Sequence, residues 1–124
     1  MTFFGNDKMQ TIRKIVFLNA SVLTSFGDFR FEQLSLEQAK DLIKKFTESE
    51  NKRIESAIGH AATAEILTEL LEYQVETNRI EFIQTTDDAA LVFKLKKRAP
   101  EGAVLNRAQV EEIGYEFGLL TKIG

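Results

Sequence analysis

The chain has no cysteine and a single histidine among its 124 residues. Without cysteine it can form no disulfide, no thiolate nucleophile and no zinc site of the cysteine type. One histidine leaves carboxylates as the remaining metal ligands, yet the sequence contains neither an Asp-x-Asp-x-Asp-Gly loop nor a His-x-x-x-His pair. We therefore expect a protein that uses no metal and no cofactor.

Long apolar runs and an excess of positive charge are also missing. No stretch approaches the roughly 20 apolar residues of a membrane span, and the N-terminus lacks the basic-then-apolar order of a signal peptide. These absences predict a cytoplasmic protein without a membrane partner. The formal net charge of −3 at pH 7 argues against a binder of long nucleic acids, because such proteins are normally basic overall. Any anion site must therefore be local.

With 44% hydrophobic residues, the chain is long enough for one compact domain and too short for two of ordinary size. We interpret residues 1–13 as an N-terminal extension and residues 14–124 as the domain. The predicted strands are 14–18, 54–58, 79–83, 90–96 and 115–120, and the predicted helices begin near Leu36, after His60 and after Asn106. This order predicts an α/β fold, a single mixed β-sheet of about five strands with helices packed on it.

Local signals support several of these elements. Ser35, with Gln38 three residues later, forms a capping box that predicts a helix start. Asn106 and Gln109 repeat this spacing before the third predicted helix. Residues 79–83 alternate between polar and apolar side chains, which is typical of a half-buried strand. We expect that strand to pair with the next one along the chain as a hairpin.

His60 lies where a short apolar run gives way to a helical pattern, directly after Gly59. Histidine has an unperturbed pKa of about 6.5, so it gives and takes protons near neutral pH. A glycine allows a sharp turn, and the first turn of the following helix offers unpaired N–H groups to an anion. His60 is thus a candidate proton donor held against a phosphate. The alternative is a helix-start histidine that packs or caps, which is the commoner case.

The basic run from Lys94 to Arg98 leads into a loop stiffened by Pro100. Arg98 can offer its guanidinium to a phosphate, or it can form a surface pair with Glu101 at a solvated strand end. Glu101 itself can orient Arg98, hold a nucleotide hydroxyl, or face water. Arg79 has two readings as well, a contact to a phosphate or base, or a charge that guards an edge strand.

Asn19 and Ser21 follow residues 14–18, a continuous β-favouring run that is typical of a strand buried on both faces. Ligands of open α/β sheets bind just beyond the ends of such strands. Asn19 and Ser21 are therefore candidate ligand contacts. They can equally be polar residues that form a turn.

Taken together, these segments resemble a known family. The resemblance is carried, in order, by residues 14–24, 56–64, 78–80, 95–102 and 113–120. Its most distinctive strings are Gly-His-x-x-Thr-Ala at 59–64 and Gly-Tyr-Glu-Phe-Gly-Leu-Leu at 114–120. The chain resembles the viral anti-CRISPR ring nuclease family, which includes the YddF-like proteins of bacteria and archaeal viruses.

The resemblance implies a specific activity. Members of that family are metal-independent homodimers that bind cyclic tetra-adenylate, the second messenger of type III CRISPR defence, and cleave it to linear di-adenylate species. By resemblance, the catalytic residues are His60, Arg98 and Glu101, and the ligand-binding residues are Asn19, Ser21 and Arg79. The active sites would lie at or near the dimer interface, and a viral member would act in the host cytoplasm.

Two other functions remain open from the sequence. A non-catalytic protein could sequester cyclic oligoadenylate without cutting it, and a small structural or interaction module would bind no such anion. Sequestration needs the arginines but no proton donor. The presence of His60 therefore favours the enzyme.

Overall fold

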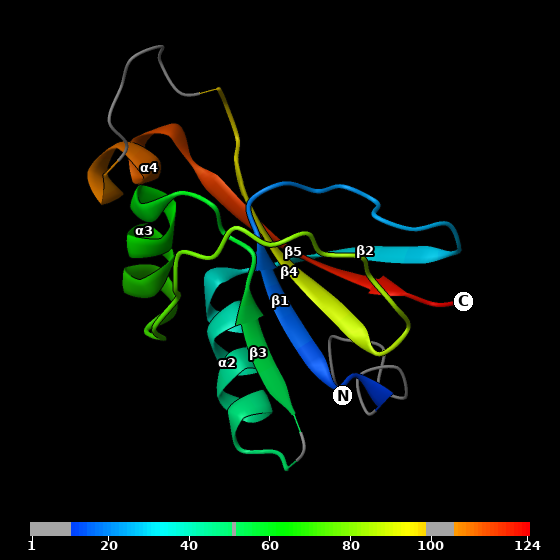
Figure 1. Cartoon of the computed structure of the whole chain (residues 1–124). Coiled ribbons are helices and arrows are strands. Elements are labelled where there is room, and N and C mark those ends of the chain that lie inside the picture. The colour runs from blue at the N-terminus through cyan, green and yellow to red at the C-terminus, as the bar shows by residue number, and fades with distance from the viewer. Residues whose placement is uncertain (1–10, 51, 99–105) are drawn as a thin grey trace.

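The computed structural model describes residues 11–50, 52–98 and 106–124. Within them, one mixed sheet is formed by β1 (Lys14–Leu18), β2 (Phe29–Leu34), β3 (Arg53–Ser56), β4 (Asp88–Leu95) and β5 (Tyr115–Lys122) (Figure 1). The helices are α2 (Leu36–Thr47), α3 (Ala61–Leu71) and α4 (Arg107–Ile113). The predicted fold class, a five-stranded mixed sheet with helices packed on it, is confirmed. No helix of these residues is long and apolar enough to cross a membrane.

Three parallel strands end at one edge of the sheet. The strand order is β2-β5-β4-β1-β3, so β1 lies between β3 and β4, and it runs parallel to both. β5 pairs antiparallel with β4 and with β2. The chain therefore leaves β1, β3 and β4 on the same side, the upper edge in Figure 1. We call this side of the sheet the carboxyl edge. It comprises the ends of these strands and the residues that follow them, 19–21, 57–60 and 96–98.

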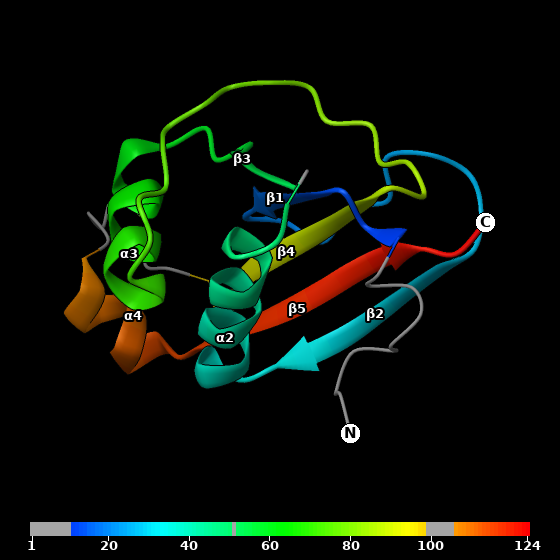
Figure 2. The same ribbon diagram turned by 90° about the horizontal axis from the view of Figure 1, so that it is seen from below.

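Helices α2, α3 and α4 all lie on one face of the sheet (Figure 2). The start of α2 shows the predicted capping box, because Gln38 N donates to Ser35 Oγ at 3.1 Å and Ser35 N donates to Gln38 Oε1 at 2.9 Å. Ile15 and Phe17 of β1 are buried against this helical layer. The α2 residues in the same core are Ala39, Leu42, Ile43 and Phe46.

Coil covers the opposite face of the sheet, as Figure 2 shows. Val16 and Leu18 point to this side and form a second, smaller core, so β1 is buried on both faces as predicted. Phe82, in the long connection between α3 and β4, packs on this core. Gln84, only 1% exposed, donates from Nε2 to the carbonyls of Asp88 (3.2 Å) and Leu120 (2.8 Å). These bonds fix the coil to the sheet.

Two strand assignments from the sequence were wrong. Residues 79–83 are coil in the structure, so the predicted hairpin with the following strand does not form. The fifth strand of the sheet is instead β2, which the sequence did not predict. It pairs with β5 over its whole length. Its Phe31 ring lies over Gly118, where a Cβ atom would overlap the ring. This contact joins residues far apart in the chain, which explains why local patterns missed the strand.

The start of the described chain belongs to the core. Ile12 lies in the stretch interpreted as an N-terminal extension, yet its side chain is fully buried in the main core. Arg13 N donates to the carbonyl of Asp87 at 2.7 Å, which fixes the entry to β1. Residues 1–10 lie outside the described residues.

Candidate active site

The topology brings candidate residues from distant parts of the sequence to the carboxyl edge. Asn19 and Ser21 follow β1, His60 follows β3, and Arg98 follows β4. All four residues are exposed. The end of β1 lies level with the end of β3, because Phe17 pairs with Ser56, whereas β4 continues three residues beyond Val92, the partner of Leu18.

The two remaining candidates are Glu101 and Arg79. Glu101 lies outside the described residues. Arg79 lies in the coil after α3, not on a strand, so the reading in which it guards an edge strand was wrong. Its Nε donates to the carbonyl of Gly59 at 2.9 Å, which places Arg79 directly beside the His60 backbone. A Cβ at Gly59 would come within 3.3 Å of Arg79 Cγ, so glycine permits this close approach.

His60 is the N-cap residue of α3, and its side chain makes no capping hydrogen bond. Its backbone is extended, with φ −124° and ψ 128°. The ring is exposed and so does not pack in the core. Neither structural role that the sequence left open, packing or side-chain capping, describes His60 in this structure.

Helices α2 and α4 have the side-chain N-cap that α3 lacks at His60. Ser35 caps α2, and Asn106 caps α4 by accepting from Gln109 N at 2.9 Å. Serine and asparagine are preferred at this position because their side chains accept a backbone N–H of the first turn. At α3 a histidine occupies the same position without doing so, and the first turn holds no acidic residue. The N–H groups of this turn and the imidazole therefore face the solvent together.

Arg98 extends the basic end of β4. Lys96 N donates to the Gly114 carbonyl at 2.9 Å, and the Lys96 side chain passes over Gly114, whose φ is +90°. These contacts tie the end of β4 to the start of β5. Lys96, Lys97 and Arg98 are all exposed, so three cationic side chains follow β4 at the carboxyl edge.

One residue of this region was missed by the sequence reasoning. Asn78 donates from Nδ2 to the Ser56 carbonyl and from its backbone N to the Ile58 carbonyl, both at 2.8 Å. It thereby holds the link that carries His60. An asparagine in an otherwise ordinary coil gives no local signal for such a role, because both of its partners lie about 20 positions earlier in the chain.

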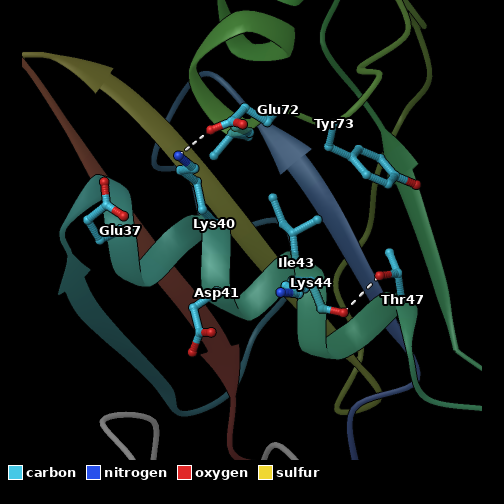
Figure 3. A pocket seen from close by; sticks show the side chains of 9 residues that line it. Glu37, Lys40, Asp41, Ile43, Lys44, Thr47, Glu72 and Tyr73 are labelled. Carbon is cyan, nitrogen blue, oxygen red and sulfur yellow. Dashed lines mark hydrogen bonds and ion pairs between the residues drawn. The ribbon is translucent and has the colours of Figure 1, made fainter.

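The pocket shown in Figure 3 lies elsewhere, between α2 and the end of α3. Its volume is about 410 Å³, and the Lys40–Glu72 ion pair spans it. A hydrogen bond between the two groups raises the pKa of Lys40 and lowers that of Glu72. Glu72 follows the last turn of α3 and His60 precedes its first turn, a separation of roughly 18 Å along the helix. None of the candidate site residues lines this pocket.

No group of three or more histidine, aspartate or glutamate side chains among the described residues is placed to hold a metal ion. The described candidates at the carboxyl edge offer one imidazole, two guanidinium groups, lysines and small polar side chains.

A mixed sheet with helices on one face, and with these groups at the ends of its parallel strands, defines a class of small α/β proteins. Within that class, the chain belongs to the STIV B116-like family, which it matches over residues 15–117. B116 of Sulfolobus turreted icosahedral virus has the same fold: its structure superimposes with a TM-score of 0.67 at 21% identity, over 88% of this chain and 98% of B116.

Sequence relatives come from a bacterium and from archaeal viruses. The protein YddF of Bacillus subtilis (strain 168) is 36% identical over 110 residues, which cover 89% of this chain and 98% of YddF. ORF117 of Acidianus two-tailed virus is 33% identical over 114 residues, which cover 88% of this chain and 94% of ORF117. The resemblance to YddF-like and viral proteins is thus confirmed for the family.

Proposed function

We propose that this protein is a metal-independent ring nuclease that binds cyclic tetra-adenylate and cleaves it to linear di-adenylate products, so that type III CRISPR signalling is antagonised or switched off. The observation that carries the proposal is the state of His60, an exposed imidazole at a helix start that neither packs nor caps. Arg79 adjoins it, and Arg98 follows a parallel strand at the same edge. Membership of a family with archaeal viral proteins is consistent with this role.

The proposed reaction needs alignment, charge neutralisation and one proton. The 2′-oxygen of a ribose attacks the adjacent phosphorus, its proton passes to water, and the bond from phosphorus to the 5′-oxygen breaks. Protonated His60 gives its proton to the departing 5′-oxygen and becomes neutral. Arg98 stabilises the extra negative charge on the phosphorane. In this scheme Glu101 orients Arg98 or a ribose hydroxyl.

The proposal includes a two-fold homodimer with its active sites at or near the interface. A ring of four repeated units suits a two-fold dimer, because each subunit offers the same half-site. Exposed apolar residues adjoin the ligand-binding candidates: Val22 and Leu23 follow Ser21, and Ile80 follows Arg79. Light scattering should show a dimer, and full activity of a monomer would refute this part of the proposal.

Incubation of the purified protein with cyclic tri-, tetra- and hexa-adenylate in excess chelator tests the activity directly. We expect the tetra-adenylate to be converted to linear di-adenylate without added metal. Retention of the ring without cleavage would assign the protein to sequestration instead. If the protein neither binds nor cleaves the rings, both functions are overturned. Activity that requires divalent ions would overturn the metal-free mechanism.

A further inference from the structure

The four residues that link β3 to α3 are held from outside by another part of the chain. Residues 76–79 run alongside residues 56–59, and hydrogen bonds join Glu76, Asn78 and Arg79 to Ser56, Ile58 and Gly59. Ser56 Oγ donates to the Glu76 carbonyl at 2.5 Å and accepts from Ile58 N at 3.1 Å. His60 is therefore carried on a short link whose backbone is paired on one side.

Asn78 supplies two of these bonds, and they enclose one residue of the link. Its side-chain amide reaches the carbonyl of Ser56, and its backbone N–H reaches the carbonyl of Ile58. Ser56 is 8% exposed and Ile58 is fully buried, so both accepting carbonyls belong to buried residues, whereas Asn78 itself is exposed. The orientation of residues 57–60 thus depends on Asn78.

We infer that Asn78 is a positioning residue for His60, an inference that rests on the proposed function. His60 has no side-chain hydrogen bond that caps its helix, and the backbone that carries it decides where its Cβ atom lies. A displacement of about 1 Å at a reacting group can cost as much as 100-fold in rate. Asn78 touches no reacting atom in this scheme and acts through the link.

A double-mutant cycle separates positioning from general stability. Asn78→Asp keeps the size and the backbone N–H but removes the side-chain donor to the Ser56 carbonyl. We expect single-turnover cleavage of cyclic tetra-adenylate to fall at least 10-fold, while the affinity for the ring changes by no more than about twofold. In a His60→Ala background the same substitution should cause no further loss, because the group that it positions is gone.

Two further variants serve as controls. Asn106→Asp makes the same chemical change at the cap of α4, where aspartate also caps well, and should leave cleavage unchanged. Asn78→Ala removes the donor without adding charge and should slow cleavage as Asn78→Asp does. If Asn78→Asp fails to fold, Asn78→Ala carries the comparison.

The outcomes distinguish the inference from the function on which it rests. Cleavage by the wild type together with unchanged cleavage by both Asn78 variants would overturn the positioning role alone. An equal loss in the presence and absence of the imidazole would assign Asn78 to a structural role. If the wild type does not cleave the ring, the proposed function fails and the positioning role with it. Hydrogen exchange of the Ala57 and Ile58 amides, which donate to the Phe17 carbonyl and to Ser56 Oγ, should accelerate in the Asn78 variants whatever the ligand. Unchanged exchange would refute the claim that the two Asn78 bonds hold the link.

Discussion

Replacing His60 by serine should stabilise the fold and remove the activity at the same time. The backbone at this position is already extended, as an N-cap requires, but the histidine side chain makes no capping bond. Ser35 shows in this same chain that a serine at the N-cap accepts the N–H three residues later. His60→Ser should likewise accept the N–H of Thr63.

The size of the effect follows from the cap and from the length of the chain. A serine cap is worth about 0.5–1 kcal/mol relative to a residue that does not cap. For a domain of this size, about 1 kcal/mol corresponds to roughly 4 °C in Tm. We therefore expect Tm to rise by about 2–4 °C. Loss of a positioned acid should slow cleavage by about 10²–10⁴-fold while the ring still binds.

The assay combines thermal unfolding, ring affinity and single-turnover cleavage of cyclic tetra-adenylate by the wild type and by His60→Ser. His60→Ala, which supplies neither a cap nor an acid, is the matched control and should lose activity without gaining stability. Near wild-type cleavage by well-folded His60→Ser would remove the proposed mechanism. A fall in Tm of several degrees would show that the imidazole contributes packing, contrary to its exposure.

Three other substitutions test separate parts of the structure. Arg98→Ala should weaken ring binding or cleavage by roughly 10- to 100-fold, since a charge-assisted contact contributes about 1.5–3 kcal/mol; unchanged values for both would place Arg98 outside the site. Gln84→Leu leaves two buried carbonyls without their donor and should cost about 2–4 kcal/mol in urea unfolding; an unchanged midpoint would contradict this account. Glu72→Gly removes a residue with φ 55° and should raise Tm by a few degrees. The pairing with Lys40 lowers the pKa of Glu72, so its contribution to wild-type stability is lost as the pH falls through that lowered pKa. The gain in Tm caused by Glu72→Gly should therefore be larger in acid. A gain that shrinks in acid would contradict this account of the pair.

The sequence alone determined the elements whose signals lie within a few residues. The start of α2 follows from Ser35 and Gln38, and the cap of α4 from Asn106 and Gln109, because both bonds close over three residues. The continuous apolar run of β1 likewise predicts burial on both faces without knowledge of its neighbours. His60 was a candidate from its type and its place before a helix.

Residues 29–34 and 79–83 show what local patterns could not decide. Both segments mix polar and apolar residues, yet only the first is a strand, because β5 provides it with a partner more than 80 positions later in the chain. The second is held as coil by long-range bonds near both of its ends, from Asn78 to the β3–α3 link and from Gln84 to the sheet. Pairing depends on which segments meet, and alternation alone does not reveal that.

The candidate site divides in the same way. The residue types were visible in the sequence, since imidazole, guanidinium and small polar groups follow apolar strand patterns. Their placement at the same end of the sheet depends on β1 lying between β3 and β4 and parallel to both. That order is set by packing between segments that are distant in the chain. The hydrogen bond of Arg79 to Gly59 and the bonds of Asn78 to the β3–α3 link exist only in the folded chain. Their partners lie about 20 residues away, so no local interaction brings them together.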